Sequence, residues 1–141
     1  MSTEQEILVI NSAMTQIMRH IRRVDEQQGV GRARLSALAV LRFGGEHTLT
    51  QLAEAEMVSR ATMHHVVNGL EADKLIDRKD DPEDGRRQLI RLTREGRKTI
   101  DAAHRARIAY LKKLASKLNK DQLVTTANAL DTIRNESWAR N

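Results

Sequence analysis

The sequence of 141 residues contains no cysteine, one proline, and only one phenylalanine, one tyrosine and one tryptophan. The absence of cysteine excludes disulfide bonds, thiolate zinc sites and a thiol-based redox switch within this chain. With so few aromatic rings, the core must consist of Leu, Ile, Val, Met and Ala packed between helices. Readers of RNA or single strands use more aromatic stacking platforms, so the composition disfavours that class.

The sequence also lacks long apolar runs. No stretch approaches 18 uncharged apolar residues, and the start, Met-Ser-Thr-Glu-Gln-Glu, has neither the basic region nor the apolar run of a signal peptide. We therefore expect a soluble cytoplasmic protein that does not associate with a membrane.

Motifs for catalysis and metal binding are missing as well. No Gly-rich phosphate loop, nucleophile elbow or His-Glu-x-x-His motif is present. The adjacent His64 and His65 diverge by about 100° on a helix, and His20, His47 and His104 have no acidic or histidine residue at i+3 or i+4. We expect no enzymatic activity, no metal and no cofactor.

What the chain does contain is basic charge. The formal net charge is +5, with a pI near 10, which favours a polyanionic partner, although scattered lysines and arginines also serve solubility alone. At 40% apolar residues the chain is sufficient for one domain with a real core.

The most informative segment is residues 75–93, the one place where a helical sequence changes to a strand, a turn and a strand. Asp80, Asp81, Pro82, Asp84 and Gly85 provide turn chemistry, because proline presets φ, glycine accepts φ > 0 and aspartate bonds its own backbone. Apolar residues flank this turn on both sides, so the segment predicts a β-hairpin with an exposed basic tip. The tip carries Arg86 and Arg87.

Two short helices are predicted just before the hairpin. Thr48 and Gln51 have the spacing of a capping box, which starts a helix that ends near Glu56, and Ser59 can cap the next helix. At 100° per residue, Met63, Val66, Val67 and Leu70 share one face of that second helix, and Ala61, His64, His65 and Asn68 share the other. Helix, turn, helix and β-wing form the layout of a winged-helix DNA reader.

In such readers the start of the second helix contacts base edges in the major groove. The candidate base contacts are Ser59, Arg60, Thr62, His64, His65 and Asn68. Arginine can donate bidentately to guanine and asparagine can bridge adenine N6 and N7. Each residue has an alternative role, since Ser59 can be a cap alone and His64 a solvated surface residue.

The wing supplies the other candidates, which are Asp84, Arg86 and Arg87. The arginines can reach a narrow A·T minor groove, while the neighbouring carboxylates repel phosphate. We expect Asp84 to pair with one arginine and orient it; the alternative is a surface ion pair of little energetic weight. Candidate phosphate contacts, or else parts of a solvated face, are Lys79, Arg91, Arg94, Arg97 and Lys98.

Long helices flank this reader. Ile7, Ile10, Met14, Ile17, Ile21 and Val24 are spaced by 3, 4, 3, 4 and 3 residues, which predicts an apolar seam along a helix. The seam packs either on its own domain or on a second subunit. A long helix is expected from Thr93 to about Leu118, and Asn119 with Gln122 predicts the cap of a last helix.

We therefore predict a mainly α-helical fold with a small β-hairpin. Residues 1–32 and 97–141 form a helical dimerisation region and residues 33–96 a winged helix-turn-helix, in one compact chain without a flexible linker.

An ordered series of short motifs makes the chain resemble the MarR family of bacterial transcription regulators. The motifs are Thr-Leu-Thr-Gln-Leu-Ala-Glu-Ala at 48–55, Val-Ser-Arg-Ala-Thr at 58–62, Gly-Leu-Glu at 69–71, Leu-Ile-Asp-Arg at 75–78, Asp-Pro-Glu-Asp-Gly-Arg-Arg at 81–87 and Leu-Thr-Arg-Glu-Gly at 92–96. The terminal helices match in placement and pattern only.

The resemblance implies a homodimer, interlocked through its terminal helices, whose two winged lobes bind a pseudopalindromic double-stranded operator, most often as a repressor. It places Arg60, Thr62, His64, His65 and Asn68 on the reading helix, and it matches Asp84 and Arg86 to the Asp-x-Arg element of the wing.

The resemblance also implies release from DNA by a small aromatic or phenolic ligand bound between the dimer helices and the reader. Without the reactive cysteine of the peroxide-sensing branch, a ligand response is favoured over thiol oxidation. Arg19, His20 and Arg23 are candidate anion partners that also fit surface or interface positions, so no ligand site is assigned.

Two alternatives remain open. The winged helix can be a protein-interaction module that binds an acidic partner, or an architectural DNA binder without an operator. A sequence-specific reader loses affinity steeply with salt and retains a preference over random DNA, whereas an architectural binder shows only the salt dependence.

Overall fold

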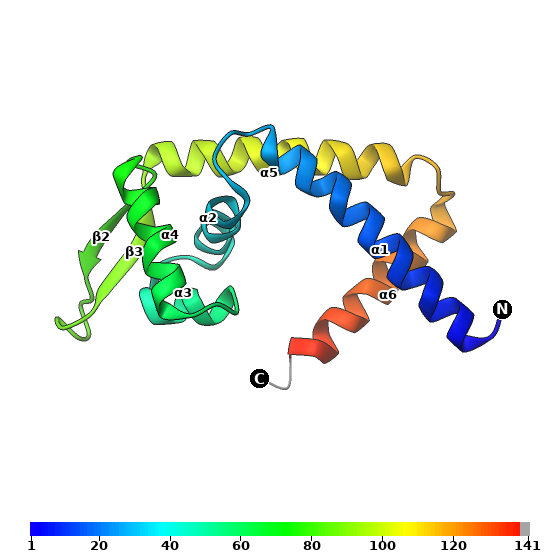
Figure 1. Cartoon of the computed structure of the whole chain (residues 1–141), viewed down its shortest axis with the longest axis horizontal. Coiled ribbons are helices and arrows are strands. Elements are labelled where there is room, and N and C mark those ends of the chain that lie inside the picture. The colour runs from blue at the N-terminus through cyan, green and yellow to red at the C-terminus, as the bar shows by residue number, and fades with distance from the viewer. Residues whose placement is uncertain (139–141) are drawn as a thin grey trace. The chain divides into compact units, whose positions relative to one another are not determined.

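The computed structural model describes residues 1–138 (Figure 1). Its elements are α1 (Thr3–Glu26), α2 (Arg32–Gly44), β1 (His47–Thr48), α3 (Leu49–Ala55), α4 (Arg60–Ala72), β2 (Ile76–Asp80), β3 (Gln88–Leu92), α5 (Arg94–Ala115) and α6 (Lys120–Trp138). The chain divides into two compact units, Met1–Arg107 and a second that begins at Ile108, and each is described by itself. The predicted fold class, mainly helical with a small sheet, is confirmed.

The helix α1 is closed at its start by a capping box. The Gln5 amide donates to Ser2 Oγ at 3.3 Å, and the Ser2 amide donates to Gln5 Oε1 at 2.8 Å. Near the other end of α1, the buried Asp25 accepts a hydrogen bond of 2.6 Å from Arg107 Nη2 on α5. This ion pair anchors the C-terminal end of α1 within the first unit.

The helices α2, α3 and α4 enclose the main hydrophobic core. The predicted capping box is present, with the Gln51 amide donating to Thr48 Oγ1 at 3.2 Å and the Thr48 amide donating to Gln51 Oε1 at 2.9 Å. The residues expected to face inward on α4, Met63, Val66, Val67 and Leu70, are all buried. They pack with Leu38, Leu41 and Leu52, so α3 and α4 share one hydrophobic core.

The sheet has three antiparallel strands in the order β1-β3-β2. The predicted hairpin is β2 and β3, whose register pairs Arg78 with Ile90 and Asp77 with Arg91. In Figure 1 the hairpin lies beside α4. The strand β1 was not predicted, because two residues are too few to show an alternating pattern.

The start of α5 packs closely on Lys74 and Leu75, in the turn that follows α4. Thr93 Oγ1 donates to the Lys74 carbonyl at 2.7 Å and accepts from the Gly96 amide at 3.0 Å. A Cβ on Gly96 would lie 1.8 Å from the Leu75 carbonyl oxygen, so only glycine fits there. The helix ends at Ala115, three residues before the expected end at Leu118.

In the second unit, α6 begins with the predicted cap. The Gln122 amide donates to Asn119 Oδ1 at 2.9 Å, and the Asn119 amide donates to Gln122 Oε1 at 3.0 Å. Its exposed large apolar residues are Leu123, Val124, Leu130 and Ile133. Across residues 1–138, no helix combines the length and the apolarity that crossing a membrane requires.

Candidate nucleic-acid interface

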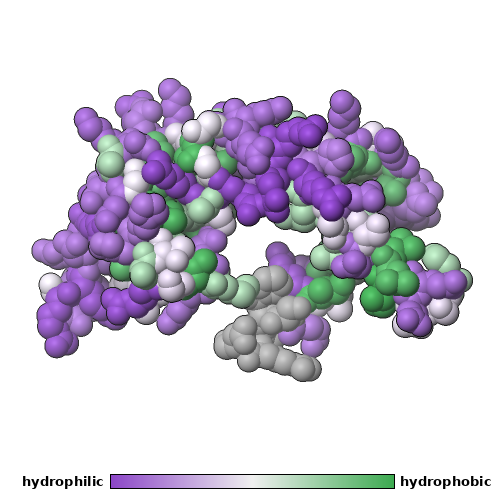
Figure 2. All heavy atoms as spheres, in the orientation of Figure 1, coloured by the Kyte–Doolittle hydropathy of each residue, from purple (hydrophilic) through white to green (hydrophobic). Residues whose placement is uncertain are grey.

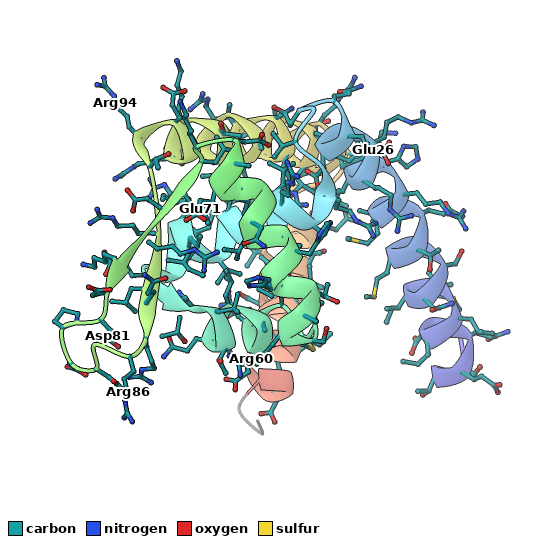
Figure 3. All side chains as sticks on the ribbon, turned by 60° about the vertical axis from the view of Figure 1, so that its left-hand side comes forward. Glu26, Arg60, Glu71, Asp81, Arg86 and Arg94 are labelled. Atoms are coloured by element: carbon teal, nitrogen blue, oxygen red, sulfur yellow. The ribbon has the colours of Figure 1, made fainter. Side chains whose placement is uncertain are left out.

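The exposed face of α4 is the first part of the candidate site. The predicted base contacts Arg60, Thr62, His64, His65 and Asn68 are all exposed, as is Ser59 before them. No carboxylate occurs between Ser59 and Leu70, so this part of α4 offers hydrogen-bond donors and positive charge, and Glu71, near the end of the helix, is paired with Arg78. Figure 3 shows Arg60 at the start of α4, at the end of the reader where the wing tip also lies.

The side chain of Ser59 is engaged in capping. Its Oγ accepts from the Thr62 amide at 3.1 Å and donates to Thr62 Oγ1 at 2.9 Å. The hydroxyls of Ser59 and Thr62 are therefore hydrogen-bonded to each other, and the Ser59 hydroxyl caps the start of α4. Arg60 is the first residue of α4, and His64 and His65 follow in its second turn.

In the wing, Asp84 holds Arg86 as expected. Asp84 Oδ1 accepts from the Arg86 amide and from Arg86 Nε, both at 3.1 Å. These hydrogen bonds lower the pKa of Asp84, the side-chain bond being the larger cause. The Arg86 side chain is 91% exposed, so the carboxylate orients the guanidinium without covering it.

Arg87 has a different environment from Arg86. Its Nη2 donates to Asp81 Oδ2 at 3.2 Å, and the Asp81 side chain is only 9% exposed. Asp81 Oδ1 also accepts from the Glu83 amide at 2.9 Å, while the Asp81 amide donates to the Arg87 carbonyl at 3.0 Å. Asp81 thus organises the turn, and Arg87 closes it; Figure 3 shows Asp81 and Arg86 at the hairpin tip.

One contact between the hairpin and α4 was missed by sequence reasoning. Arg78 on β2 donates from Nη2 to Asn68 Oδ1 and from Nε to Glu71 Oε2, each at 3.1 Å. The sequence carries a weak signal for it, because Asn68 and Glu71 are one helical turn apart on α4. Nothing in the pattern indicates that β2 places an arginine between them.

Several of the candidate phosphate contacts have carboxylate partners. Lys79 Nζ lies 3.0 Å from Glu46 Oε2, and Arg91 Nε lies 2.5 Å from Asp77 Oδ1. The bond to Asp77 also raises the pKa of Arg91. Arg94, Arg97 and Lys98 are exposed near the start of α5.

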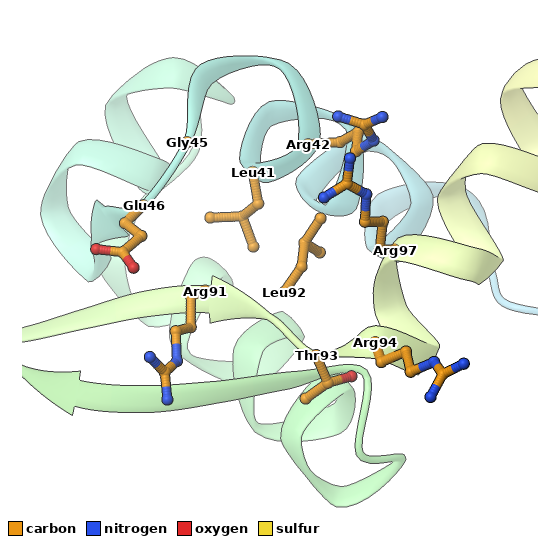
Figure 4. Close-up of a pocket in the computed structure, with 9 residues that line it drawn as sticks. All are labelled: Leu41, Arg42, Gly45, Glu46, Arg91, Leu92, Thr93, Arg94 and Arg97. Atoms are coloured by element: carbon orange, nitrogen blue, oxygen red, sulfur yellow. The ribbon is translucent and has the colours of Figure 1, made fainter.

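Several arginines line a pocket of about 440 Å³ between the end of α2, β3 and the start of α5 (Figure 4). Arg42 Nε donates to Asp101 Oδ1 at 2.8 Å, which lowers the pKa of Asp101, and Arg91 is held by Asp77. In Figure 4 the Arg94 side chain points away from the pocket. The arginines therefore do not converge on a common point.

A second pocket, of about 600 Å³, lies between α1, α2 and α5 in the first unit. Its lining includes Phe43, Arg32, His104 and Arg107, and the rings of Phe43 and His104 have centroids 5.0 Å apart. The sequence candidates for an anion partner, Arg19, His20 and Arg23, are not among the residues that line it. Within the described residues, no group of three or more His, Asp or Glu side chains could hold a metal ion.

A short helix-turn-helix followed by a hairpin with an exposed basic tip defines a winged helix-turn-helix protein. The MarR family model matches residues 28–87. An uncharacterized HTH-type transcriptional regulator of Mycobacterium leprae is 32% identical over 124 residues, which cover 88% of this chain and 87% of that protein.

Two solved structures have the same fold. A MarR family protein from Bacillus stearothermophilus aligns with a TM-score of 0.84 and 17% identity, covering 97% of this chain and 99% of that one. Streptococcus pneumoniae FabT, solved in complex with DNA, aligns with a TM-score of 0.80 and 19% identity, covering 96% and 99%. The chain belongs to the MarR family of transcriptional regulators, and not to a family of enzymes.

Proposed function

We propose that this chain is a dimeric, sequence-specific regulator that binds a pseudopalindromic operator in double-stranded DNA and represses the promoter containing it. The observation that carries the proposal is the exposed surface of α4 from Arg60 to Asn68, which carries no carboxylate, beside a wing whose Arg86 is 91% exposed. The DNA-bound structure of S. pneumoniae FabT, which has the same fold, supports a duplex as the partner.

In this proposal α4 enters the major groove. His64, His65 and Asn68 meet base edges, because they lie on the exposed face of the helix away from the buried Val67 and Leu70. Arg60 joins them from the first turn of α4, where its side chain is also exposed. Ser59 and Thr62 contribute through the cap and through contacts near the start of the helix, where the dipole favours a phosphate.

The wing contacts the minor groove through Arg86. Asp84 pre-orients the guanidinium, which reduces the conformational entropy lost on binding. Arg86→Ala should weaken binding to all duplexes and reduce the salt slope by about 1. Arg87→Ala removes the partner of Asp81 and should instead lower stability, since the Asp81 side chain is only 9% exposed.

The apolar seam of α1 supports a dimer. The exposed fractions are 58% for Ile7, 48% for Ile10 and 57% for Met14, whereas Ile21 is buried. In Figure 2 apolar atoms gather over the N-terminal part of α1, while the hairpin end is mostly hydrophilic. A seam this exposed needs a partner, and a second copy provides one; two-fold symmetry then places two reading helices on half-sites about one helical turn apart.

The 600 Å³ pocket is the proposed site for a small-molecule ligand that releases DNA. Phe43 offers an aromatic face and Arg32 a cation, which suits an aromatic carboxylate or phenolate. The pocket is lined by α1, α2 and α5, so a ligand that binds one arrangement of these helices more tightly shifts the equilibrium toward that arrangement and moves the reading helices with it. The free energy of this shift is at most the difference between the ligand's binding free energies for the two arrangements.

The test is a fluorescence-anisotropy titration of the full chain against duplex from its own upstream region, with random duplex as competitor and with salt varied. We expect competitor-resistant binding whose affinity falls steeply with salt. Benzoate and phenol added to the complex should lower the anisotropy if the ligand proposal holds. Equal affinity for both duplexes would favour the architectural binder, and no binding to any duplex would favour the protein-interaction module.

A further inference from the structure

The contact between Arg78 and α4 links the hairpin to a proposed base-reading residue. Arg78 lies on β2 with its side chain only 20% exposed, and its two hydrogen bonds, to Asn68 Oδ1 and Glu71 Oε2, are both 3.1 Å long. Figure 3 shows Glu71 on α4 near the hairpin. The guanidinium is therefore held by a carboxylate on one side while it meets an amide on the other.

The chemistry of this contact determines which end of the Asn68 amide faces outward. A guanidinium has five N–H donors and no acceptor, so the amide must turn its oxygen toward Arg78. The amide nitrogen, with two donors, then lies on the opposite side of the group. An unrestrained asparagine can present either end, and it suits adenine because it can donate and accept together.

We propose that Arg78 is a positioning residue for base specificity, which holds Asn68 so that α4 presents a hydrogen-bond donor at that base position. This inference rests on the proposed function, because it concerns the selectivity of the same DNA-reading face. Guanine, adenine and thymine offer acceptors in the major groove, whereas cytosine offers an N–H donor. The chain should therefore discriminate against cytosine at the position that Asn68 meets.

Glu71 restrains the Arg78 guanidinium more than its hydrogen bond to Asn68 alone would. Its carboxylate restrains the Nε side of Arg78, so the Nη2 atom that reaches Asn68 has little freedom. Glu71 and Asn68 lie on the same helix, three residues apart, and β2 supplies the arginine from outside. The hairpin thus affects base choice without itself contacting the base.

The experiment selects operator half-sites from a randomised duplex pool with the full chain and with three variants. Arg78→Ala should reduce the discrimination against cytosine at one position per half-site by roughly 10-fold, with other positions unchanged. Asn68→Asp keeps an acceptor for Arg78 but replaces the outward donor with an acceptor, so it should gain cytosine there. The matched control is Arg91→Ala, since Arg91 is a hairpin arginine whose carboxylate partner, Asp77, lies on β2. It should leave the base preference at every position unchanged, even if a lost phosphate contact lowers the overall affinity.

A measurement without DNA separates this inference from the proposed function. In NMR relaxation of side-chain amides, the Asn68 NH₂ group should be ordered in the parent and mobile in Arg78→Ala, but unaffected by Arg91→Ala. If Arg78→Ala fails to fold, Glu71→Gln loosens the arginine while keeping its packing, and it should produce a smaller shift in the same direction.

The outcomes are distinct. A parent protein that selects no sequence refutes the proposed function and this inference with it. A parent that selects a sequence, together with an Arg78→Ala profile equal to the parent's or an equally ordered amide, refutes the role of Arg78 alone. A loss of selectivity at every position at once would also refute it, because it would show that Arg78 only supports the fold.

Discussion

Replacing Gly96 with alanine should be among the most damaging small changes in this chain. An added Cβ would lie 1.8 Å from the Leu75 carbonyl oxygen and 2.8 Å from its carbon, distances that no real Cβ contact shows. Neither the start of α5 nor the Leu75 carbonyl can move freely. The Thr93 amide donates to that same oxygen at 3.1 Å, the Leu75 amide donates to Leu70 at 2.9 Å, and Thr93 Oγ1 binds the Lys74 carbonyl at 2.7 Å.

The expected cost follows from these contacts. Relieving the clash requires the start of α5 to move away from Leu75, which weakens the two hydrogen bonds that Thr93 donates to the Lys74 and Leu75 carbonyls, each with a net value of about 1 kcal/mol. Overpacking adds about 1–3 kcal/mol. The better helix propensity of alanine returns at most about 1 kcal/mol, so a net loss of roughly 2–4 kcal/mol is expected.

Urea unfolding followed by circular dichroism, at one fixed protein concentration, measures this change. Gly85→Ala is the matched control, because nothing lies within 4 Å of the position that a Cβ would take there and its φ is not positive; it should change stability by less than about 0.5 kcal/mol. Equal stability of the Gly96 variant and the parent would show that the helix start is far more adaptable than its hydrogen bonds indicate.

Three further predictions concern stability. Arg107→Ala leaves the carboxylate of Asp25, 6% exposed, without its 2.6 Å partner and should cost about 1–3 kcal/mol in urea unfolding, reduced from the buried-pair value because Arg107 is 43% exposed. Met57 has φ of 54° and an exposed side chain, so Met57→Gly should raise the unfolding midpoint by an amount equivalent to about 1 kcal/mol. The hydrogen bond from Arg42 lowers the pKa of Asp101, so the ionised carboxylate stabilises the folded state. This contribution to the free energy of unfolding is complete above the unfolded-state pKa and is lost as pH falls through the folded-state pKa. Asp101→Asn should therefore flatten the fall of the unfolding free energy between about pH 5 and pH 2, as measured by urea unfolding.

Local patterns in the sequence predicted most of the elements because their causes are local. Capping at Thr48, Ser59 and Asn119 depends on residues three positions apart, and each predicted cap is present. The alternation of buried and exposed positions on α4 follows from helical geometry alone. The short strand β1 lacked any such pattern, since its partner β3 lies about 40 residues further along the chain.

The candidate site was harder to predict because its details depend on contacts between elements. The residues alone left open which of Arg86 and Arg87 pairs with Asp84, although the resemblance matched Asp84 with Arg86. The fold of the turn separates the two arginines by burying Asp81 beside Arg87. The role of Arg78 could not be predicted from the sequence either, because it depends on a contact between β2 and α4. Its register on β2 and the rotation of α4 must both be known before Asn68 and Arg78 are seen to meet.

The pairing of charges on the hairpin has a consequence for how it can bind DNA. Arg78, Arg87 and Arg91 each donate to a carboxylate in this structure, and those three carboxylates are Glu71, Asp81 and Asp77. A phosphate that approached any of them would have to displace a bound carboxylate, whose repulsion would oppose the contact. Asp84 also pairs with Arg86, but it leaves that guanidinium 91% exposed, so Arg86 can meet a phosphate or a groove edge while its carboxylate stays in place. Charge pairing is therefore expected to restrict strong DNA contacts from the hairpin to its tip. Of the paired arginines, Arg78 holds the wing against α4, whereas Arg87 and Arg91 pair within the hairpin.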